Sequence, residues 1–501
     1  MKKINIIIGL CAFSILVASC SKQLNKTPFD SISKEQSFKS VKDAKNWDVG
    51  LYATLRGNVY GIFTFSTDVQ ADQLNASLDY GNRNGFPHKW DGFLSDDYTI
   101  RDVWSGYYYA IANINVALAG FQEIKPENAA DSLNLKHYTG DEYLARAYYY
   151  FELVQRWAKS YNPSSATQDL GVPLIIKYEL NGLPARATVD AVYKQILSDI
   201  SMAKTMLADV AGSLGSSKFN VDVAYALEAR VKLNMQDWQG AYAAANQLIS
   251  SGRYPLVTTQ GGLDSMWHYD APNETIMQLY VSAPSELANT NNIYIGYNSG
   301  NNSYDPDFIP SQWVVDMFPS NDFRLNTYFM KDSVLIQGAK YGNIYLVNKY
   351  PGNPALYTSA STNYEQAPKI FRIGEMYLIA AEAEANIGGA SESIALSLLN
   401  TLRMHRGYTV ALTGLAGASL KQAVMDERFR ELAFEGFRLD DLKRWNMGFT
   451  RKDPQNINII VTGADFNTKT VAAGADKFVW GIPANDMTIN PNLKGEQNPG
   501  W

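Results

Sequence analysis

Residues 426–446 read DERFRELAFEGFRLDDLKRWN, a segment that combines dense charge with an apolar helical stripe. The apolar side chains recur at steps of three and four, the spacing that places residues on one face of a helix. They are Phe429, Leu432, Ala433, Phe437, Leu439 and Leu442. Gly436 interrupts the pattern, and a glycine inside a helix costs roughly 1 kcal/mol relative to alanine. We therefore predict a helix with a charged face that packs closely, or breaks, at Gly436.

The charges of this segment allow two interpretations. Glu427, Glu431 and Glu435 are spaced to share one helical face, and aligned carboxylates could serve general acid–base chemistry. Interleaved charges of opposite sign more often form a structural network of ion pairs. We favour the network, and we expect it to include Glu431, Glu435, Arg438 and Arg444. It would clamp the last helical hairpin onto the C-terminal tail.

The first residues of the chain read as a secretion signal. Lys2 and Lys3 precede an apolar run, and the order Leu-Val-Ala-Ser-Cys that ends at Cys20 resembles a bacterial lipobox. We predict that residues 1–19 are a lipoprotein signal peptide and that Cys20 carries the lipid. The other cysteine, Cys11, lies inside the signal, so Cys20 would have no partner for a disulfide. The alternative is an ordinary cleaved signal that happens to contain Cys20.

The composition describes a globular body without a nucleic-acid partner. Hydrophobic residues make up 46% of the 501 residues and charged residues 19%, as in folded proteins. The net charge of −6 argues against nucleic acid. After the leader, no segment has the roughly eighteen uninterrupted apolar residues that a membrane span requires. We therefore expect a folded body that a lipid holds at a membrane surface.

Helical periodicity dominates the chain outside two long irregular stretches. We expect helices at residues 41–56, 103–121, 138–159 and 189–207. Ala229 and Ala241 lie twelve residues apart in segment 225–249, and Ala383 and Ala395 repeat that offset in segment 377–403. Small residues at this offset let antiparallel helices pack closely, as in tetratricopeptide hairpins. The sequence thus predicts a mainly α fold of tetratricopeptide-like hairpins with long irregular loop regions.

The two irregular stretches, residues 57–98 and 251–368, mix aromatic rings with Asn, Asp and Arg side chains. Long ordered loops of this kind tend to carry function. Rings provide stacking area and polar groups provide orienting hydrogen bonds, which a pocket for a polar ligand needs. The rings with the best prospects of touching a ligand are Trp90, Tyr297 and Tyr304. The alternative is that these rings pack the loops onto the helices.

Motifs that mark common catalytic and cofactor sites are missing from the sequence. There is no dinucleotide-binding or Walker loop, no zinc-protease motif, no nucleophile elbow and no calcium-binding loop. The histidines are scattered, which disfavours a zinc site. Paired carboxylates for sugar hydrolysis meet in space rather than in sequence, and nothing marks such a pair here. We predict no cofactor, no metal ion and no catalytic activity.

Several landmarks, in their order along the chain, resemble the SusD/RagB family. They are the lipobox at Cys20, GDEYLARAYYYFELVQRWA with DLGVPLI after it, FRIGEMYLIAAEAEAN, DERFRELAFEGFRLDDLKRW and NPNLKGEQNPGW. The resemblance implies a surface-exposed lipoprotein of the outer membrane of Bacteroidota, anchored through Cys20. Such proteins lie as lids over a SusC-like TonB-dependent transporter and bind nutrient oligomers without catalysis. The resemblance also implies that a SusD-like region, 20–250, and a SusD/RagB region, 251–501, form one integrated unit.

The resemblance also implies where a ligand would bind. Starch-binding members use an arc of aromatic rings with Asn and Arg nearby, which fits the loop before Trp90 and the loop with Tyr297. Our candidate ligand-binding residues are Asn75, Asn82, Arg83, Trp90, Tyr297, Tyr304 and Arg372. The stretch IPSQWVVDMFPSNDFR resembles the RagB branch, which handles peptides. The ligand is thus an oligosaccharide, which we favour, or a peptide. A helical-repeat scaffold without a small ligand is the remaining alternative.

Overall fold

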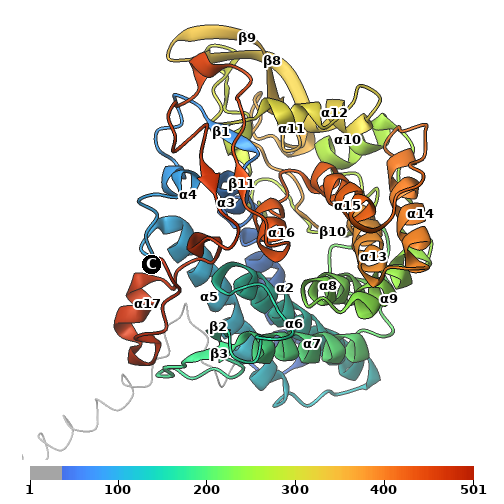
Figure 1. The fold of residues 1–501 in the computed structure, drawn as a ribbon. Coiled ribbons are helices and arrows are strands. Elements are labelled where there is room, and N and C mark those ends of the chain that lie inside the picture. The colour runs from blue at the N-terminus through green and yellow to red at the C-terminus, as the bar shows by residue number, and fades with distance from the viewer. Residues whose placement is uncertain (1–36) are drawn as a thin grey trace, which may run out of the picture.

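The computed structural model describes residues 37–501, and helices are the main regular structure of this part of the chain (Figure 1). The mainly α fold class predicted from the sequence is confirmed. The predicted signal peptide and the lipid site at Cys20 lie outside the described residues. Within residues 37–501, no helix has both the length and the apolar character needed to cross a membrane.

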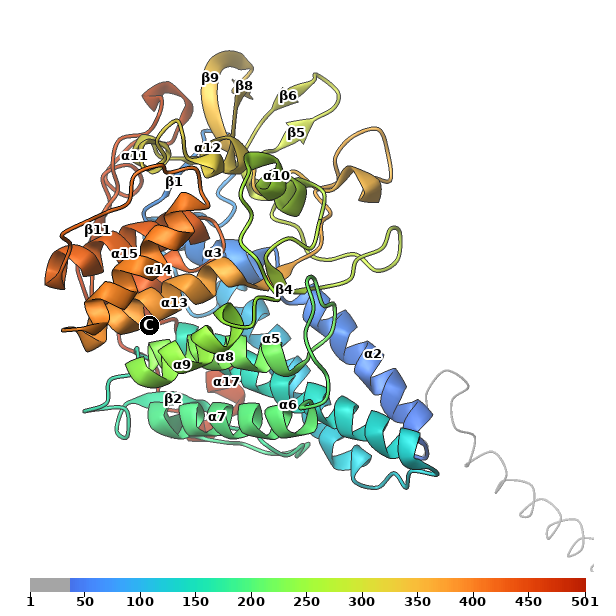
Figure 2. The same ribbon diagram turned by 90° about the vertical axis from the view of Figure 1, so that its right-hand side faces the viewer.

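A row of antiparallel helices forms the frame of the molecule (Figure 2). The helices of the row are α6 (Ala129–Trp157), α7 (Val189–Met206), α8 (Val221–Asn234), α9 (Trp238–Ile249), α13 (Ile373–Ile387), α14 (Ser391–Met404) and α15 (Gly417–Leu432). The two predicted hairpins are confirmed as α8 with α9 and α13 with α14. Ala229, Ala241, Ala383 and Ala395 are fully buried, so small side chains do line the helix contacts. Helix α9 packs on α13, which joins the two hairpins although about 130 residues separate them.

Two further helices, α2 (Val41–Gly57) and α5 (Tyr98–Phe121), pack on α6. Helix α2 starts as predicted, after Ser40, whose hydroxyl and backbone N–H both donate to Asp43. Helix α5 starts five residues earlier than predicted because the Asp97 carboxylate accepts from the backbone N–H of Thr99 and caps it there. An Asn128 cap likewise moves the start of α6 ahead of the predicted residue 138.

The first irregular stretch contains more regular structure than we predicted. It includes α3 (Ile62–Gln70), β1 (Leu74–Ala76) and α4 (Gly85–Lys89). Helix α3 is buried on nearly every side, including the polar residues Thr67, Asp68 and Gln70. A helix without a solvent-facing side has no alternation of apolar and polar positions, so periodicity does not reveal it.

The second irregular stretch carries half of the strands of the described residues, including the two longest. A four-stranded sheet has the order β5–β6–β8–β9, and strand β8 forms a hairpin with β9 through Gln337 and Gly338, which both have positive φ. The strands are β5 (Tyr297–Asn298), β6 (Ser303–Tyr304), β8 (Phe329–Ile336) and β9 (Ala339–Val347). Strand β7 (Phe308–Pro310) pairs with β1, with Asn75 opposite Ile309. This pairing brings the two irregular stretches side by side.

The remaining elements are short. Between the hairpins lie α10 (Gln260–His268), β4 (Thr275–Gln278), α11 (Gln312–Asp316), α12 (Phe323–Tyr328) and β10 (Lys369–Arg372). Strand β10 pairs with β4, β2 (Leu170–Pro173) with β3 (Arg186–Thr188), and β11 (Phe449–Thr450) with β12 (Thr470–Val471). The tail carries α17 (Ala484–Ile489), and the buried Trp480 packs against Trp157 of α6.

The segment 426–446 folds as two helices rather than one. Helix α15 ends at Leu432 and α16 (Arg438–Arg444) begins six residues later. Phe434 and Gly436 both have positive φ in the turn between them. A Cβ on Gly436 would lie 3.0 Å from the carbonyl oxygen of Thr64 in α3, so glycine is needed here for close approach as well as for the backbone angle. Glu435 therefore leaves the helical face that it was expected to share with Glu427 and Glu431.

Candidate functional site

The charges of segment 426–446 meet partners that lie far away in the sequence. The Glu431 carboxylate is fully buried and accepts from Arg372 Nη1 at 2.9 Å, Arg324 Nη1 at 3.0 Å and Arg406 Nε at 2.8 Å. Glu435 accepts from Lys349 Nζ at 2.7 Å and from Arg372 Nη2 at 2.6 Å. We call these side chains the Glu431 network.

The electrostatics of this network hold its carboxylates as ions. Burial alone would raise the pKa of Glu435, but Arg372 and Lys349 outweigh it and the pKa lies below its ordinary value. For Glu427, burial is outweighed by Arg324 and other guanidinium groups, which lower the pKa to about 2. A carboxylate that stays ionised and fully paired is poorly suited to donate or accept a proton in catalysis, which weighs against the acid–base interpretation.

Arg438 and Arg444 also form ion pairs, but with other partners than the clamp hypothesis required. Arg438 donates to both carboxylate oxygens of Asp72, at 2.9 and 2.7 Å. Arg444 pairs with Glu382 of α13 and with Asp441. The expectation that the ion pairs of this stretch reach the C-terminal tail was wrong, because their partners all precede the tail. The stretch does contact the tail, but through the apolar side chains Leu439 and Leu442, which pack with Phe478. The pairs join α16 to α13 and to the loop after α3.

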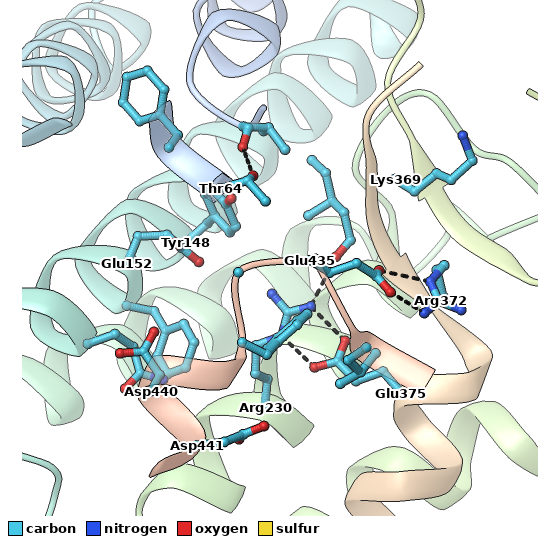
Figure 3. Close-up of a pocket in the computed structure, with 18 of the residues that line it drawn as sticks. Thr64, Tyr148, Glu152, Arg230, Lys369, Arg372, Glu375, Glu435, Asp440 and Asp441 are labelled. Carbon is cyan, nitrogen blue, oxygen red and sulfur yellow. Dashed lines mark hydrogen bonds and ion pairs between the residues drawn. The ribbon is translucent and has the colours of Figure 1, made fainter. Parts of the chain in front are cut away.

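A small charged pocket of about 90 Å³ lies beside the network (Figure 3). Arg230 pairs with Glu375 on one side of it, and Arg372 pairs with Glu435 on the other. Arg372 is 2% exposed and its guanidinium group is held by Glu431 and Glu435. The structure thus places Arg372 in the ion-pair network, at the wall of this small pocket.

A much larger cleft, of about 750 Å³, opens where the two irregular stretches meet. We call it the tyrosine cleft. Helix α3, the loop before α4, the start of α5 and the segment around β5 contribute its walls. The lining side chains are Ile62, Phe65, Arg83, Asn84, Tyr98, Asn292, Ile293, Tyr297, Asn298, Ser299, Asp305, Asp307 and Tyr364.

Two of the predicted ligand residues, Arg83 and Tyr297, meet in this cleft although more than 200 residues separate them. Arg83 Nε donates to Asp307 Oδ2 at 2.7 Å, and Asp307 lies next to β7. The Arg83 side chain remains 59% exposed, whereas Asp307 is 11% exposed. Burial raises the pKa of Asp307 even though Arg83 opposes the shift.

Hydrogen bonds hold the hydroxyl groups of two rings of the cleft, those of Tyr297 and Tyr98. The Tyr297 hydroxyl donates to Asn302 Oδ1 at 2.9 Å, and its ring packs against Tyr304 at 5.4 Å between centroids. The Tyr98 hydroxyl donates to Asn84 Oδ1 at 2.9 Å. Tyr304 supports the ring of Tyr297 from β6 but does not itself line the cleft. A ring fixed in this way offers stacking area to a ligand at low entropic cost.

Other predicted ligand residues lie elsewhere. Trp90 Nε1 donates to the Gln70 carbonyl at 2.7 Å, and its ring packs edge-on against Phe478 at 4.9 Å, so it fills a core contact rather than the cleft. Asn75 is 1% exposed and its Oδ1 accepts from the Ser311 hydroxyl. Asn82 is exposed next to Arg83 in sequence but is not part of the cleft lining.

Sequence reasoning missed several residues of the cleft, among them Tyr98, Asn292 and Tyr364. Tyr98 is the first residue of α5, and its position could have been found from the capping residue Asp97 before it. Tyr364 lies in a segment without periodicity, and its contact with Tyr297 comes from a hydrogen bond between its hydroxyl and the Tyr297 backbone N–H. No local signal predicts that contact.

No metal site accompanies the cleft in the described part of the chain. Residues 37–501 contain no group of three or more His, Cys, Asp or Glu side chains arranged to hold a metal ion. What the cleft offers instead is aromatic area, amides and carboxylates, which suit reversible binding of a polar ligand.

The chain thus combines a frame of helical hairpins with an open, ring-lined cleft. Two family descriptions match its sequence: "Starch-binding associating with outer membrane" over residues 23–233 and "SusD family" over residues 294–501. The chain belongs to the SusD/RagB family.

Known relatives extend over nearly the whole chain. A SusD-like protein of Formosa agariphila is 25% identical, over 96% of this chain and 95% of its own length. A SusD superfamily protein of Bacteroides vulgatus has a similar structure, with a TM-score of 0.77 and 22% identity, covering 93% of this chain and all of its own. A SusD-like carbohydrate-binding protein of the same species has a TM-score of 0.74 at 17% identity, over 92% of this chain and 98% of its own. At such identities the structural likeness shows a common fold.

Proposed function

We propose that this protein is a non-enzymatic binding protein of the outer-membrane surface that captures oligosaccharides in the tyrosine cleft. The supporting observation is that Tyr297, Tyr98 and Arg83 converge on one open cleft of about 750 Å³ from separate parts of the chain. Rings stack on the apolar faces of sugars, and Asn, Asp and Arg side chains bond their hydroxyl groups. A carbohydrate-binding SusD-like protein of the same fold supports this choice of ligand.

One argument for a peptide ligand, the resemblance to the RagB branch, is weaker once the fold is known. The segment that resembles the RagB branch, residues 309–324, contributes no residue to the cleft lining. Trp313 stacks on Phe429 at 5.0 Å and Arg324 is fully buried in the Glu431 network, whereas Asp316 and residues 319–321 are exposed. These contacts support an interpretation of the resemblance as one of packing rather than of ligand.

We further propose that Cys20 carries a lipid anchor and that a SusC-like TonB-dependent transporter receives the ligand. In this proposal the regions 20–250 and 251–501 act as one integrated unit, supported by the pairing of β1 with β7 and of Asp72 with Arg438. Replacing Cys20 by alanine is expected to move the protein out of the membrane fraction, and a pull-down of the tagged native protein is expected to recover the transporter. A membrane fraction that keeps the Cys20→Ala variant would contradict the anchor.

Calorimetric titration of the mature protein with a panel of oligosaccharides and peptides tests the ligand. We expect binding of at least one oligosaccharide and no release of reducing ends. Tyr297→Ala is expected to weaken that binding by about 1–3 kcal/mol. Tyr109→Ala is the matched control, because Tyr109 is 65% exposed on α5 and lies outside the cleft lining. Binding of peptides alone, or release of reducing ends, would reject the proposal.

A further inference from the structure

The charged side chains of the tyrosine cleft are unevenly balanced. Among the residues that line it, Arg83 is the cation, and Asp305 and Asp307 are the carboxylates. A ligand that enters the cleft therefore meets more negative than positive charge. The effect of this imbalance on a ligand depends on whether each charged side chain already has an ion-pair partner within the protein.

Arg83 is satisfied within the protein. Its Nε and Nη2 atoms both donate to the Asp307 carboxylate, in a two-point pair that matches the planar shapes of the two groups. Such a pair cancels most of the field of the guanidinium group at the distance of a ligand. Arg83 can still donate a hydrogen bond from its exposed edge, but it does not supply an uncompensated positive charge.

Asp305 is not satisfied in the same way. Its side chain is exposed at the cleft, and no cation of the described chain forms an ion pair with it. Burial, together with the neighbouring carboxylates Asp79 and Asp307, raises the pKa of Asp305, and Arg83 opposes this shift only in part. The local field around Asp305 is thus negative.

We propose that the tyrosine cleft selects uncharged oligosaccharides and rejects glycans that carry carboxylate or sulfate groups, with Asp305 as the residue that sets this selectivity. The inference rests on the proposed function and names the class of sugar for the same site. A carboxylate accepts hydrogen bonds from the hydroxyl groups of a neutral sugar. The same carboxylate repels an anionic substituent, and in a partly desolvated cleft this repulsion is stronger than in water.

A cleft built for polyanions would look different. It would present Arg or Lys side chains that the protein leaves unpaired, because these would have to neutralise the ligand. Within the described lining of this cleft the single guanidinium group already belongs to Asp307. Selectivity here comes from a repulsive element, Asp305, combined with rings that accept any sugar face.

The test uses the mature protein and two sets of probes. The neutral set contains gluco-, xylo-, manno- and galacto-oligosaccharides; the anionic set contains oligogalacturonate, alginate fragments and sulfated galactan fragments. We expect the best neutral probe to bind at least about tenfold more tightly than any anionic probe. We also expect its affinity to be unchanged between low and high salt, because no ligand charge is involved.

Variants at Asp305 test whether this residue sets the preference for neutral probes. Asp305→Asn is expected to reduce the preference for neutral probes several-fold, and Asp305→Lys to reduce it further or reverse it. Glu127→Gln is the control, because Glu127 is an exposed carboxylate outside the cleft lining. Thermal unfolding of each variant shows whether it has folded.

The outcomes separate the inference from the proposed function. An anionic glycan that binds the wild-type protein more tightly than every neutral probe would overturn the inference while the glycan-binding function stands. An unchanged preference in folded Asp305→Asn and Asp305→Lys variants would reject Asp305 as the selecting residue. Absence of binding to every glycan in both sets would reject the proposed function itself.

Discussion

The Glu431 network and the tyrosine cleft contain similar kinds of polar side chain but differ in how these are satisfied. In the network, Glu431 is fully buried and three guanidinium groups surround it. In the cleft, the Arg83 side chain is 59% exposed, and the exposed Asp305 forms no ion pair with a cation of the described residues. A dense run of charge in the sequence marks the first region, whereas scattered rings and amides mark the second. Charges that the protein itself pairs hold the fold, and groups that it leaves open are available to a ligand.

The largest expected effect comes from breaking the network at its centre. Glu431→Ala removes the carboxylate that Arg372, Arg324 and Arg406 share, so each of these buried guanidinium groups loses one of its partners. The carboxylates that remain, among them Glu435 and Glu274, compensate the buried positive charge only in part. We expect a loss of about 3–5 kcal/mol in the free energy of unfolding, measured by urea denaturation, and a low yield of folded protein. Glu127→Gln serves as the control. A Glu431→Ala protein as stable as the wild type would show that the network does not hold the fold.

Asp68 lies between the two regions and makes their connection sensitive to pH. Its carboxylate is fully buried and accepts from the Gly436 backbone N–H at 3.0 Å and from the Tyr294 hydroxyl. Burial raises its pKa from 3.8 to about 7. Between pH 3.8 and pH 7, Asp68 is therefore protonated in the folded state and ionised in the unfolded state. The stability that Asp68 contributes is therefore complete below pH 3.8 and decreases as the pH rises through 7, in total by up to about 4 kcal/mol.

The check for Asp68 compares Asp68→Asn with the wild type at two pH values. Asparagine cannot lose the proton, so the variant is expected to lose less stability than the wild type between pH 5 and pH 8. Urea denaturation at both values gives the two differences. Equal differences at pH 5 and pH 8 would mean that Asp68 does not titrate in this range.

Arg438→Ala is expected to have a smaller effect than Glu431→Ala. The change leaves the nearly buried Asp72 without its two-point partner, but Asp72 is 8% exposed at its side chain and Arg438 18%, so water can reach the site. We expect a loss of about 3 kcal/mol in the free energy of unfolding, at the lower end of the range for buried pairs. Thermal or urea unfolding measures this loss. If Arg438→Ala lost more free energy of unfolding than Glu431→Ala, the pair of Arg438 with Asp72 would be more important for stability than the contacts of Glu431.

Local sequence patterns were sufficient for the frame of the molecule. The apolar spacing that predicted a helix at residues 41–56 is that of a half-buried helix, and α2 ends within one residue of the prediction. The alanine offsets found both hairpins because close packing of two helices needs small residues at fixed positions. Helix α3 was missed because it is buried on nearly all sides and lacks the polar face on which the pattern depends.

The site was less predictable because long-range contacts create it. The contact of Arg83 with Asp307 joins residues 224 positions apart. The sequence around either residue contains no pattern that predicts the other as its partner. Trp90 looked like a ligand contact because it lies in a polar loop, but its side chain packs against Phe478 of the distant tail. Arg372 also looked like a ligand contact in the sequence, but its guanidinium group pairs with Glu431 and Glu435, which lie about 60 residues further along the chain. Ring content therefore predicted a ring-lined site and one of its rings, Tyr297, but not the others, Tyr98 and Tyr364.

The central claim is that the tyrosine cleft, and not the Glu431 network, binds the ligand. The most direct test is a calorimetric titration of the wild-type protein, Tyr297→Ala and Arg438→Ala with the best oligosaccharide from the panel. We predict that Tyr297→Ala weakens binding by about 10- to 100-fold and that folded Arg438→Ala binds within about twofold of the wild type. A folded Arg438→Ala protein that has lost binding, together with a Tyr297→Ala protein that binds normally, would contradict the account.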